Sequence, residues 1–280
     1  MGANRYGKDG IRLVLVRRHP DRHDLRDLTV DVRLEGDFDR AHTEGDNASV
    51  LPTDTMRSTV YALAQDHLTG SIEEFGAALG ERFLAAAPAA SLAEVTLCEH
   101  DWQRVAAAGS PHPHAFRGGT TERATAVVTS GRGVRPRVRS GLEGLTVLKT
   151  TGSAFAGFLH DELTVLAETD DRILATDVTA QWDYAEQRAP AYDEVRAAAR
   201  EALVLAFATH DASQSVQHTL YVMGEAVLAA RPEIASISLR MPNKHHVLVD
   251  LSGFGIENDH AVFVATDRPF GVIEGTVRRA

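Results

Sequence analysis

Hydrophobic and polar positions alternate near the start of the chain in the pattern that predicts β-strands. In residues 28–34 every second residue is apolar, and residues 11–16 form another apolar stretch of strand length. The segment between them, from His19 to Arg26, is polar and typical of a turn. The pattern therefore predicts an antiparallel hairpin.

Two helices and two further strands are predicted after the hairpin. Apolar residues three or four positions apart mark both helices, and the second opens with the capping box Ser71-x-x-Glu74. The helices are expected at about 54–65 and 71–87, and the strands at 94–102 and about 125–129. The first 130 or so residues thus have the predicted order β-β-α-α-β-β.

The same order begins again in the second half. Residues 131–141 are basic and poor in large apolar side chains, which indicates a linker. The elements predicted after it are strands at 145–149 and 172–176, helices at 194–208 and 216–230, and strands at 234–241 and 247–251. The repeat predicts an α+β protein of two tandem units, 1–135 and 136–280, each an antiparallel β-sheet with helices on one face. A sheet covered on one face only leaves edges and a second face for partners, so oligomerisation is expected.

The composition restricts the possible classes of protein. A chain of 280 residues, 44% of them hydrophobic, can bury one large core or two ordinary ones. The formal net charge of -10 opposes non-specific binding to nucleic acid or to an anionic membrane, and no apolar run approaches the ~18 residues of a membrane span. The single cysteine, Cys98, cannot form an intramolecular disulfide and fits a reducing, cytoplasmic setting.

Common catalytic signatures and metal motifs are missing from the sequence. It contains no Gly-x-Gly-x-x-Gly, Walker loop, Gly-x-Ser-x-Gly or His-Glu-x-x-His. His112 with His114, or His245 with His246, could in principle bind a metal, because imidazole is a common ligand. Thirteen histidines produce such pairs by chance, and adjacent strand residues point to opposite faces. We therefore predict no metal site.

Several polar residues are suited to a planar anionic ligand, although each also has an ordinary explanation. Thr53 and Asp54 stand at a helix start, where free N–H groups attract anions and where both residue types also serve as caps. Arg172 could grip a planar anion or could pair with the aspartates before it. The remaining candidates are Phe155 for stacking, or as a core residue, and Gln217 and Asn243 as amides that read donor and acceptor edges.

Seven segments, taken together and in this order, resemble the motifs of uricases. The resemblance covers nearly the whole chain and is carried by Tyr6-Gly7-Lys8-Asp9, Thr53-Asp54 with Thr59-Val60-Tyr61, Pro111-His112-Pro113-His114, Gly144-Leu145-Thr146-Val147-Leu148-Lys149, Phe155-x-Gly157-Phe158-Leu159, Ser215-Val216-Gln217 and Pro242-Asn243-Lys244-His245. It implies two tunnelling-fold (T-fold) units per subunit in a homotetramer, and cofactor-independent oxidation of urate by O2 to 5-hydroxyisourate and hydrogen peroxide.

The resemblance also assigns roles to individual residues. It implies a catalytic relay of Lys8 and Thr53 from one subunit and His245 from its neighbour, so that active sites lie between subunits. The expected substrate contacts are Arg172 and Gln217 at the urate edge, Phe155 stacked on the ring, the backbones of Val216 and Asp54, and Asn243 with Thr53 above the ring. The C-terminal Thr-Val-Arg-Arg-Ala lacks a peroxisomal Ser-Lys-Leu signal, so a cytoplasmic enzyme is expected.

These residue types suit the chemistry that the resemblance implies. Triplet oxygen reacts slowly with ordinary organic molecules, but a deprotonated, electron-rich urate can itself give an electron to oxygen. The protein then needs a base, fixed donors and a stacking surface. Two alternatives remain at the level of sequence: a zinc-dependent cyclohydrolase or pterin-pathway enzyme of the same fold, and a non-catalytic purine-binding module.

Overall fold

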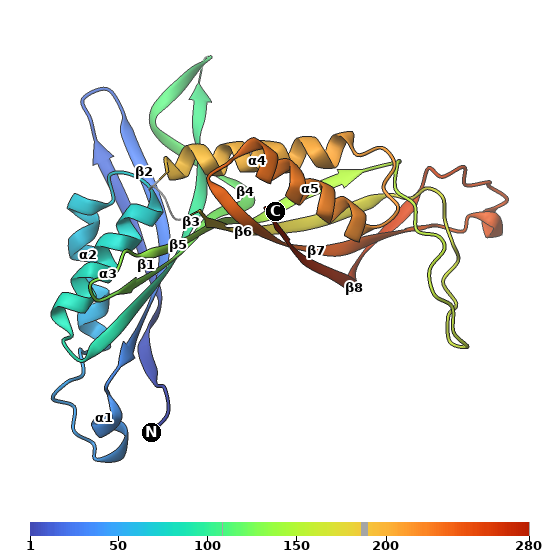
Figure 1. Ribbon diagram of the computed structural model, residues 1–280. Helices are drawn as coiled ribbons and strands as arrows, with labels where there is room; N and C mark the ends of the chain where they lie inside the picture. Colours follow the sequence, from blue (N-terminus) through green and yellow to red (C-terminus); the bar gives the residue numbers. More distant parts are fainter. Residues whose placement is uncertain (108, 186–189, 280) are drawn as a thin grey trace. The chain divides into compact units, whose positions relative to one another are not determined.

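The computed structural model describes residues 1–107, 109–185 and 190–279, which divide into two compact units. The first unit comprises Met1–Leu142 together with the start of helix α4 (Tyr192–Thr209) up to Arg196, and the second comprises the rest of the described chain. Figure 1 shows the elements of both in chain order. Among the described residues, no helix is long and apolar enough to cross a membrane.

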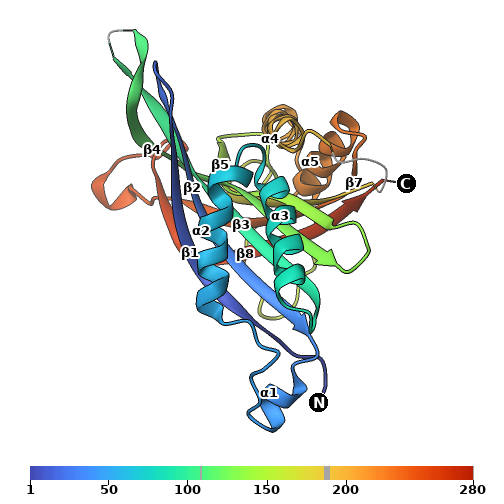
Figure 2. The same cartoon turned by 90° about the vertical axis from the view of Figure 1, so that its left-hand side faces the viewer.

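An antiparallel sheet with helices on one face forms the first unit. Its strands β1 to β4 pair in chain order, and helix α2 packs on β1 while α3 packs on β3 and β4 (Figure 2). The strands are β1 (Arg5–Arg18), β2 (His23–Gly36), β3 (Ala90–Ala107) and β4 (Ser110–Gly131). The helices are α1 (Asp39–Thr43), α2 (Thr53–His67) and α3 (Ile72–Ala86).

The alternation seen in the sequence accounts for the core of this unit. Leu28, Val30, Val32 and Leu34 of β2 are all 0% exposed and face the helices. Each fully buried aliphatic side chain of this size stabilises the fold by about 1.5–3 kcal/mol. The capping box predicted at Ser71 is confirmed, because its hydroxyl accepts the Glu74 N–H and the Glu74 carboxylate accepts the Ser71 N–H.

Glycine on the inner face of a helix allows a close approach to the sheet in both units. A Cβ at Gly76 of α3 would lie 2.8 Å from side-chain carbons of both Leu97 and Val128. In the second unit, a Cβ at Gly224 would lie 2.5 Å from a methyl carbon of Val277. The repeat recognised in the order of elements therefore extends to the packing.

Gly76→Ala is expected to lower the free energy of unfolding by about 1–3 kcal/mol, because the added methyl group overpacks the helix against two branched side chains. Gly118→Ala is the matched control, since a Cβ there meets nothing within 4 Å. Urea unfolding of both variants measures the effect. Equal stability of the two variants would contradict the packing argument.

The second unit repeats the arrangement. Strands β6, β7 and β8 pair antiparallel in chain order, and α5 packs on β7 and β8 with α4 beside it (Figure 1). The strands are β5 (Arg137–Lys149), β6 (Leu174–Tyr184), β7 (Ile234–Leu248) and β8 (Phe263–Arg278). The helices are α4 (Tyr192–Thr209), α5 (Val216–Ala230) and a short 3-10 turn, η1 (Ser252–Phe254).

The sequence prediction differs from the structure in three details. The second part of the expected linker 131–141 belongs to β5, where the buried Ser140 and half-buried Val138 alternate with arginines that hid the strand pattern. The strands expected at 234–241 and 247–251 are one strand, β7, which continues through the polar segment from Pro242 to His246. The closing strand β8 was not predicted, because Pro269 and its glycines resemble breakers.

Candidate active site

Lys8 and Thr53 lie in the first unit, on elements that a tyrosine connects. Lys8 lies on β1 opposite Val32, just before the register shift that leads to Ile11. The Tyr6 hydroxyl donates to the Leu51 carbonyl at 3.1 Å and accepts the Leu51 N–H at 2.8 Å. Burial raises the Tyr6 pKa, so this phenol stays protonated and able to donate. Tyr6 thus fixes the segment before Thr53 to the strand that carries Lys8.

Thr53 and Asp54 do not cap helix α2. The N-cap residue is Pro52, which has no side-chain cap, and Thr53 is already in the first turn. Among the described residues the Thr53 hydroxyl and the Lys8 ammonium make no hydrogen bond or ion pair with another side chain or backbone group. Asp54 pairs with Arg57 at 2.5 Å. The capping explanation for Thr53 is therefore wrong, and its hydroxyl is available to a ligand.

Arg172 and Phe155 come together in the second unit. Phe155 exchanges two backbone hydrogen bonds with Thr169, at 2.8 and 3.0 Å, which folds the segment 155–172 back on itself. The guanidinium carbon of Arg172 then lies 5.2 Å from the centre of the Phe155 ring. Phe155 is only partly buried, so it is not a core phenylalanine. The pair therefore places a planar cation over the face of an aromatic ring.

The charge of Arg172 is not neutralised within the described part of the chain. Neither Asp170 nor Asp171 pairs with it, its buried Nε has no hydrogen-bond partner there, and burial lowers its pKa. The explanation that Arg172 pairs with the preceding aspartates is therefore wrong. A half-buried guanidinium without a carboxylate is costly unless an anion binds it.

The start of helix α5 presents a set of donors. Ser215 is the N-cap and accepts the His218 N–H at 3.1 Å. Val216 is buried, whereas the amide of Gln217 is exposed. The N–H groups of the first turn have no partner within the helix, and the dipole favours an anion there.

Asn243 and His245 lie on β7 at a distortion of the sheet. Asn243 is 9% exposed and lies opposite Thr176 of β6, whose buried hydroxyl has no partner among the described residues. The pairing of β7 with β8 shifts between Asn243 and His245. His245 is half-buried, and its backbone carbonyl accepts the Thr266 hydroxyl at 3.3 Å. Its ring has no hydrogen-bond partner among the described residues. The unused polar atoms at Thr176 and Arg172 suit a polar ligand.

The histidine pairs do not form a metal centre in the described residues. His112 and His114 stack edge to face with ring centres 4.6 Å apart, and no group of three or more His, Cys, Asp or Glu in residues 1–107, 109–185 and 190–279 has the geometry to hold a metal ion. His246 Nδ1 lies 3.1 Å from the backbone carbonyl of Lys244.

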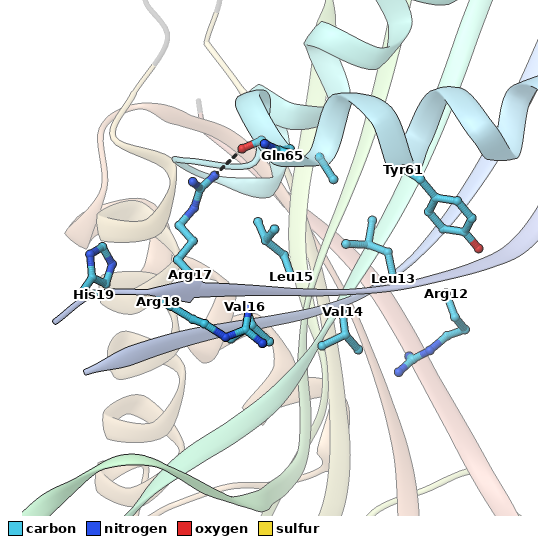
Figure 3. A pocket seen from close by; sticks show the side chains of 11 residues that line it. Arg12, Leu13, Val14, Leu15, Val16, Arg17, Arg18, His19, Tyr61 and Gln65 are labelled. Carbon is cyan, nitrogen blue, oxygen red and sulfur yellow. Dashed lines mark hydrogen bonds between the residues drawn. The ribbon is translucent and has the colours of Figure 1, made fainter. Parts of the chain in front are cut away.

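A groove of about 700 Å³ lies elsewhere on the first unit, between β1 and helix α2. Figure 3 shows Leu13, Leu15 and Arg17 pointing toward the helix, where Arg17 donates to the Gln65 carbonyl at 2.8 Å. None of the expected site residues lines this groove. It follows the free edge of β1, which pairs only with β2 in the described sheet.

Sequence reasoning did not single out three residues that contact the segments carrying expected site residues in one unit or the other. Tyr6 fixes the segment before Thr53, Thr176 places an unused hydroxyl beside Asn243, and Asp171 binds the turn before Phe155. Tyr6 lies in one of the motifs that carry the resemblance, and Asp171 adjoins Arg172, so sequence proximity was the available signal.

Two repeated antiparallel units, each with helices on one face, and a site suited to a planar anion define an α+β protein of the tunnelling-fold class. The profile of the Uricase family matches residues 4–129 and 138–274. The chain belongs to the uricase family.

Individual relatives agree over the full length. The chain is 46% identical to the uricase of Arthrobacter globiformis over 280 residues, covering 100% of this chain and 90% of the relative. It is 38% identical to the uricase of Dictyostelium discoideum, covering 99% and 96% of the two chains. The crystal structure of the Arthrobacter globiformis uricase superimposes with a TM-score of 0.93 at 45% identity, covering 100% of this chain and 94% of that one. These matches confirm the predicted family and the T-fold.

Proposed function

We propose that this chain is a urate oxidase that converts urate, O2 and water to 5-hydroxyisourate and hydrogen peroxide. Urate loses two electrons, O2 gains two electrons and two protons to become peroxide, and the oxygen of water is added to the purine. The observation that carries the proposal is the half-buried guanidinium of Arg172 beside the Phe155 ring, with no carboxylate partner in the described residues. Urate is a planar anion with the carbonyl and N–H edge that such a site recognises.

The substrate is held mainly by residues of the second unit. Arg172 and Gln217 bind the urate edge, Phe155 stacks on its ring, and the N–H of Val216 at the start of α5 completes the contact. The backbone of Asp54 reaches the substrate from the first unit. Fixed donors in a site that excludes water stabilise the developing charge better than mobile water does.

Proton transfer is assigned to Lys8, Thr53 and His245. The Lys8 ammonium and the Thr53 hydroxyl have no partner in the described chain, and Tyr6 holds the elements that carry them. We propose that Lys8, in its neutral amine form, accepts a proton from urate through the Thr53 hydroxyl and that His245 completes the relay. Asn243 and Thr53 hold oxygen or water above the ring. Because deprotonated urate is itself the electron donor, no metal or organic cofactor is required.

We further propose a homotetramer with active sites between subunits. Lys8, Thr53 and Asp54 belong to the first unit, and the other site residues belong to the second. The outer edges of β1 and β8 are unpaired in the described chain and carry exposed apolar residues, such as Val14 at 60% and Val272 at 45%. Strand edges of this kind pair readily with another chain.

Two further predictions from the sequence remain proposals. They are the domain boundary at 135/136 and a cytoplasmic location, which the single cysteine favours.

Arg172→Ala is expected to raise the KM for urate about 100-fold with a much smaller effect on kcat, because the guanidinium binds substrate and does not transfer protons. Arg278→Ala, at an exposed arginine of β8 in the same unit, is the control. Initial rates over a range of urate concentrations measure both constants. An unchanged KM would remove Arg172 from the substrate site.

The stoichiometry of the reaction tests the proposed function itself. Oxygen uptake, peroxide formation and loss of the urate ultraviolet absorbance should proceed in equal molar amounts. Binding of urate without oxygen uptake would instead indicate a purine-binding module.

A further inference from the structure

The carboxylate of Asp171 binds three consecutive residues of the turn that leads to Phe155. It accepts the Thr151 hydroxyl at 2.6 Å, the Gly152 N–H at 2.8 Å and the Ser153 N–H at 3.3 Å. These bonds, the Thr151 hydroxyl foremost, lower the Asp171 pKa, so the carboxylate is ionised at neutral pH. The backbone carbonyl of Asp171 also accepts the Thr169 hydroxyl at 2.7 Å. Asp171 therefore joins its own segment to the turn 151–153.

The turn held by Asp171 also contacts the segment that leads into helix α5. The Ala154 N–H donates to the Ser213 carbonyl at 2.8 Å, and the Ser213 N–H donates to the Gly152 carbonyl at 3.2 Å. The Ser213 hydroxyl donates to the Ser215 carbonyl at 3.0 Å, and Ser215 caps the helix. A chain of direct contacts thus extends from Asp171 to the residue before Val216 and Gln217.

Three segments that supply the proposed substrate contacts are therefore joined to the Asp171 residue, either directly or through the turn 151–153. Phe155 follows the turn 151–153 and pairs with Thr169, Arg172 is the residue after Asp171, and Gln217 lies at the start of α5. The Asp171 carboxylate makes no ion pair with the Arg172 guanidinium in the described structure, because the turn occupies its oxygens.

We propose that Asp171 is a positioning residue for the substrate site: its carboxylate fixes the turn 151–153, and through it the Phe155 ring and the start of α5, while it leaves the adjacent Arg172 free for the anionic substrate. The inference rests on the proposed function, since it concerns the same site. The role differs from that of a catalytic residue, because the carboxylate does not touch the substrate.

The electrostatic effect of Asp171 weakens urate binding, whereas its positioning effect strengthens it. A carboxylate next to an anion site repels the ligand, so removing its charge alone would tighten urate binding. If the turn 151–153 is no longer held, part of the molecules adopt conformations that do not bind urate. The apparent affinity then falls in proportion to the fraction of molecules that still can bind it. Loss of the negative charge alone would lower KM. A rise in KM when the Asp171 carboxylate is removed therefore comes from loss of the contacts to the turn.

Asp171→Ala should raise the KM for urate about tenfold, with kcat changed less than about threefold, because the charge-assisted hydrogen bonds from the carboxylate to the turn are lost. Asp170→Asn removes the same charge one residue earlier, at an exposed carboxylate with no bonded partner in the described chain, and should leave KM unchanged or lower. Thr151→Val should raise KM, because it removes the hydroxyl that donates to Asp171. Thr151→Ser keeps this hydroxyl and should have the wild-type KM.

The outcomes separate this inference from the proposed function. If the wild-type protein does not oxidise urate, the proposed function fails whatever the variants do. If it oxidises urate but Asp171→Ala keeps the wild-type KM, or raises it no more than Asp170→Asn does, Asp171 has no positioning role. If Asp171→Ala does not fold, the Thr151 pair decides, and equal KM values for Thr151→Val and Thr151→Ser overturn the inference.

Discussion

Lys8→Met is expected to lower kcat at least about 100-fold, with urate binding largely retained, because a positioned general base contributes roughly 10² to 10⁴ in rate. Methionine keeps the length and the apolar stem of lysine, so packing on β1 should be preserved. Lys8 is half-buried and unpaired in the described chain, and the Tyr6 bonds to Leu51 fix the neighbouring segment. Initial rates at saturating urate measure the loss.

A charged but non-basic substitution separates the two functions that the Lys8 side chain could have: a base as the neutral amine, or an electrostatic contact as the ammonium. Lys8→Arg keeps a positive charge and removes a group that can act as a base, since guanidinium stays protonated. It should be about as slow as Lys8→Met if proton transfer is the role of Lys8. Near-normal turnover of Lys8→Met would remove Lys8 from the mechanism, and full activity of Lys8→Arg alone would make it an electrostatic contact.

The second large effect is recovery of activity when two defective chains are mixed. Co-expression of Lys8→Met chains with Arg172→Ala chains should yield oligomers that regain about one quarter of the wild-type rate at low urate concentration. Half of randomly formed pairs are mixed, and each mixed pair has one intact site, with Lys8 from one subunit and Arg172 from the other. Each variant alone has no intact site.

The matched control mixes two variants that damage the same half of the site. Lys8→Met with Thr53→Val should show no recovery, because every site then lacks one of these two groups. Recovery limited to the first mixture supports sites between subunits. If the Lys8→Met and Arg172→Ala mixture is no more active than the mean of its two components, each site is built from a single chain.

Most of the fold could be predicted because burial on one face produces a visible period. The alternation of Leu28 to Leu34 and the capping box at Ser71 led to the right elements, and helix α5 was predicted at the residues where it is found. The prediction of strands failed where pairing with neighbouring strands overrides the local conformational preference of the residues. Pro242 lies inside β7 opposite Val272, and Pro269 lies inside β8, so hydrogen bonding to neighbouring strands sets the structure there.

The expected site residues could be proposed from the sequence only through several motifs taken together. Singly, Thr53 resembled a cap and Arg172 resembled a surface ion-pair partner, and only the structure shows that neither explanation holds. Asp171 and Tyr6 act through contacts with residues that are distant in the sequence, which no local pattern reveals. The catalytic and binding roles of the site residues remain predictions that the variants above test.

The most direct test of cofactor-independent urate oxidation is the simultaneous loss of urate ultraviolet absorbance and formation of peroxide in air, using protein stripped with a strong chelator. Full rates of both in the stripped protein are the predicted result. Absence of both until a metal ion is restored would contradict the account and would indicate a metal-dependent enzyme of the same fold.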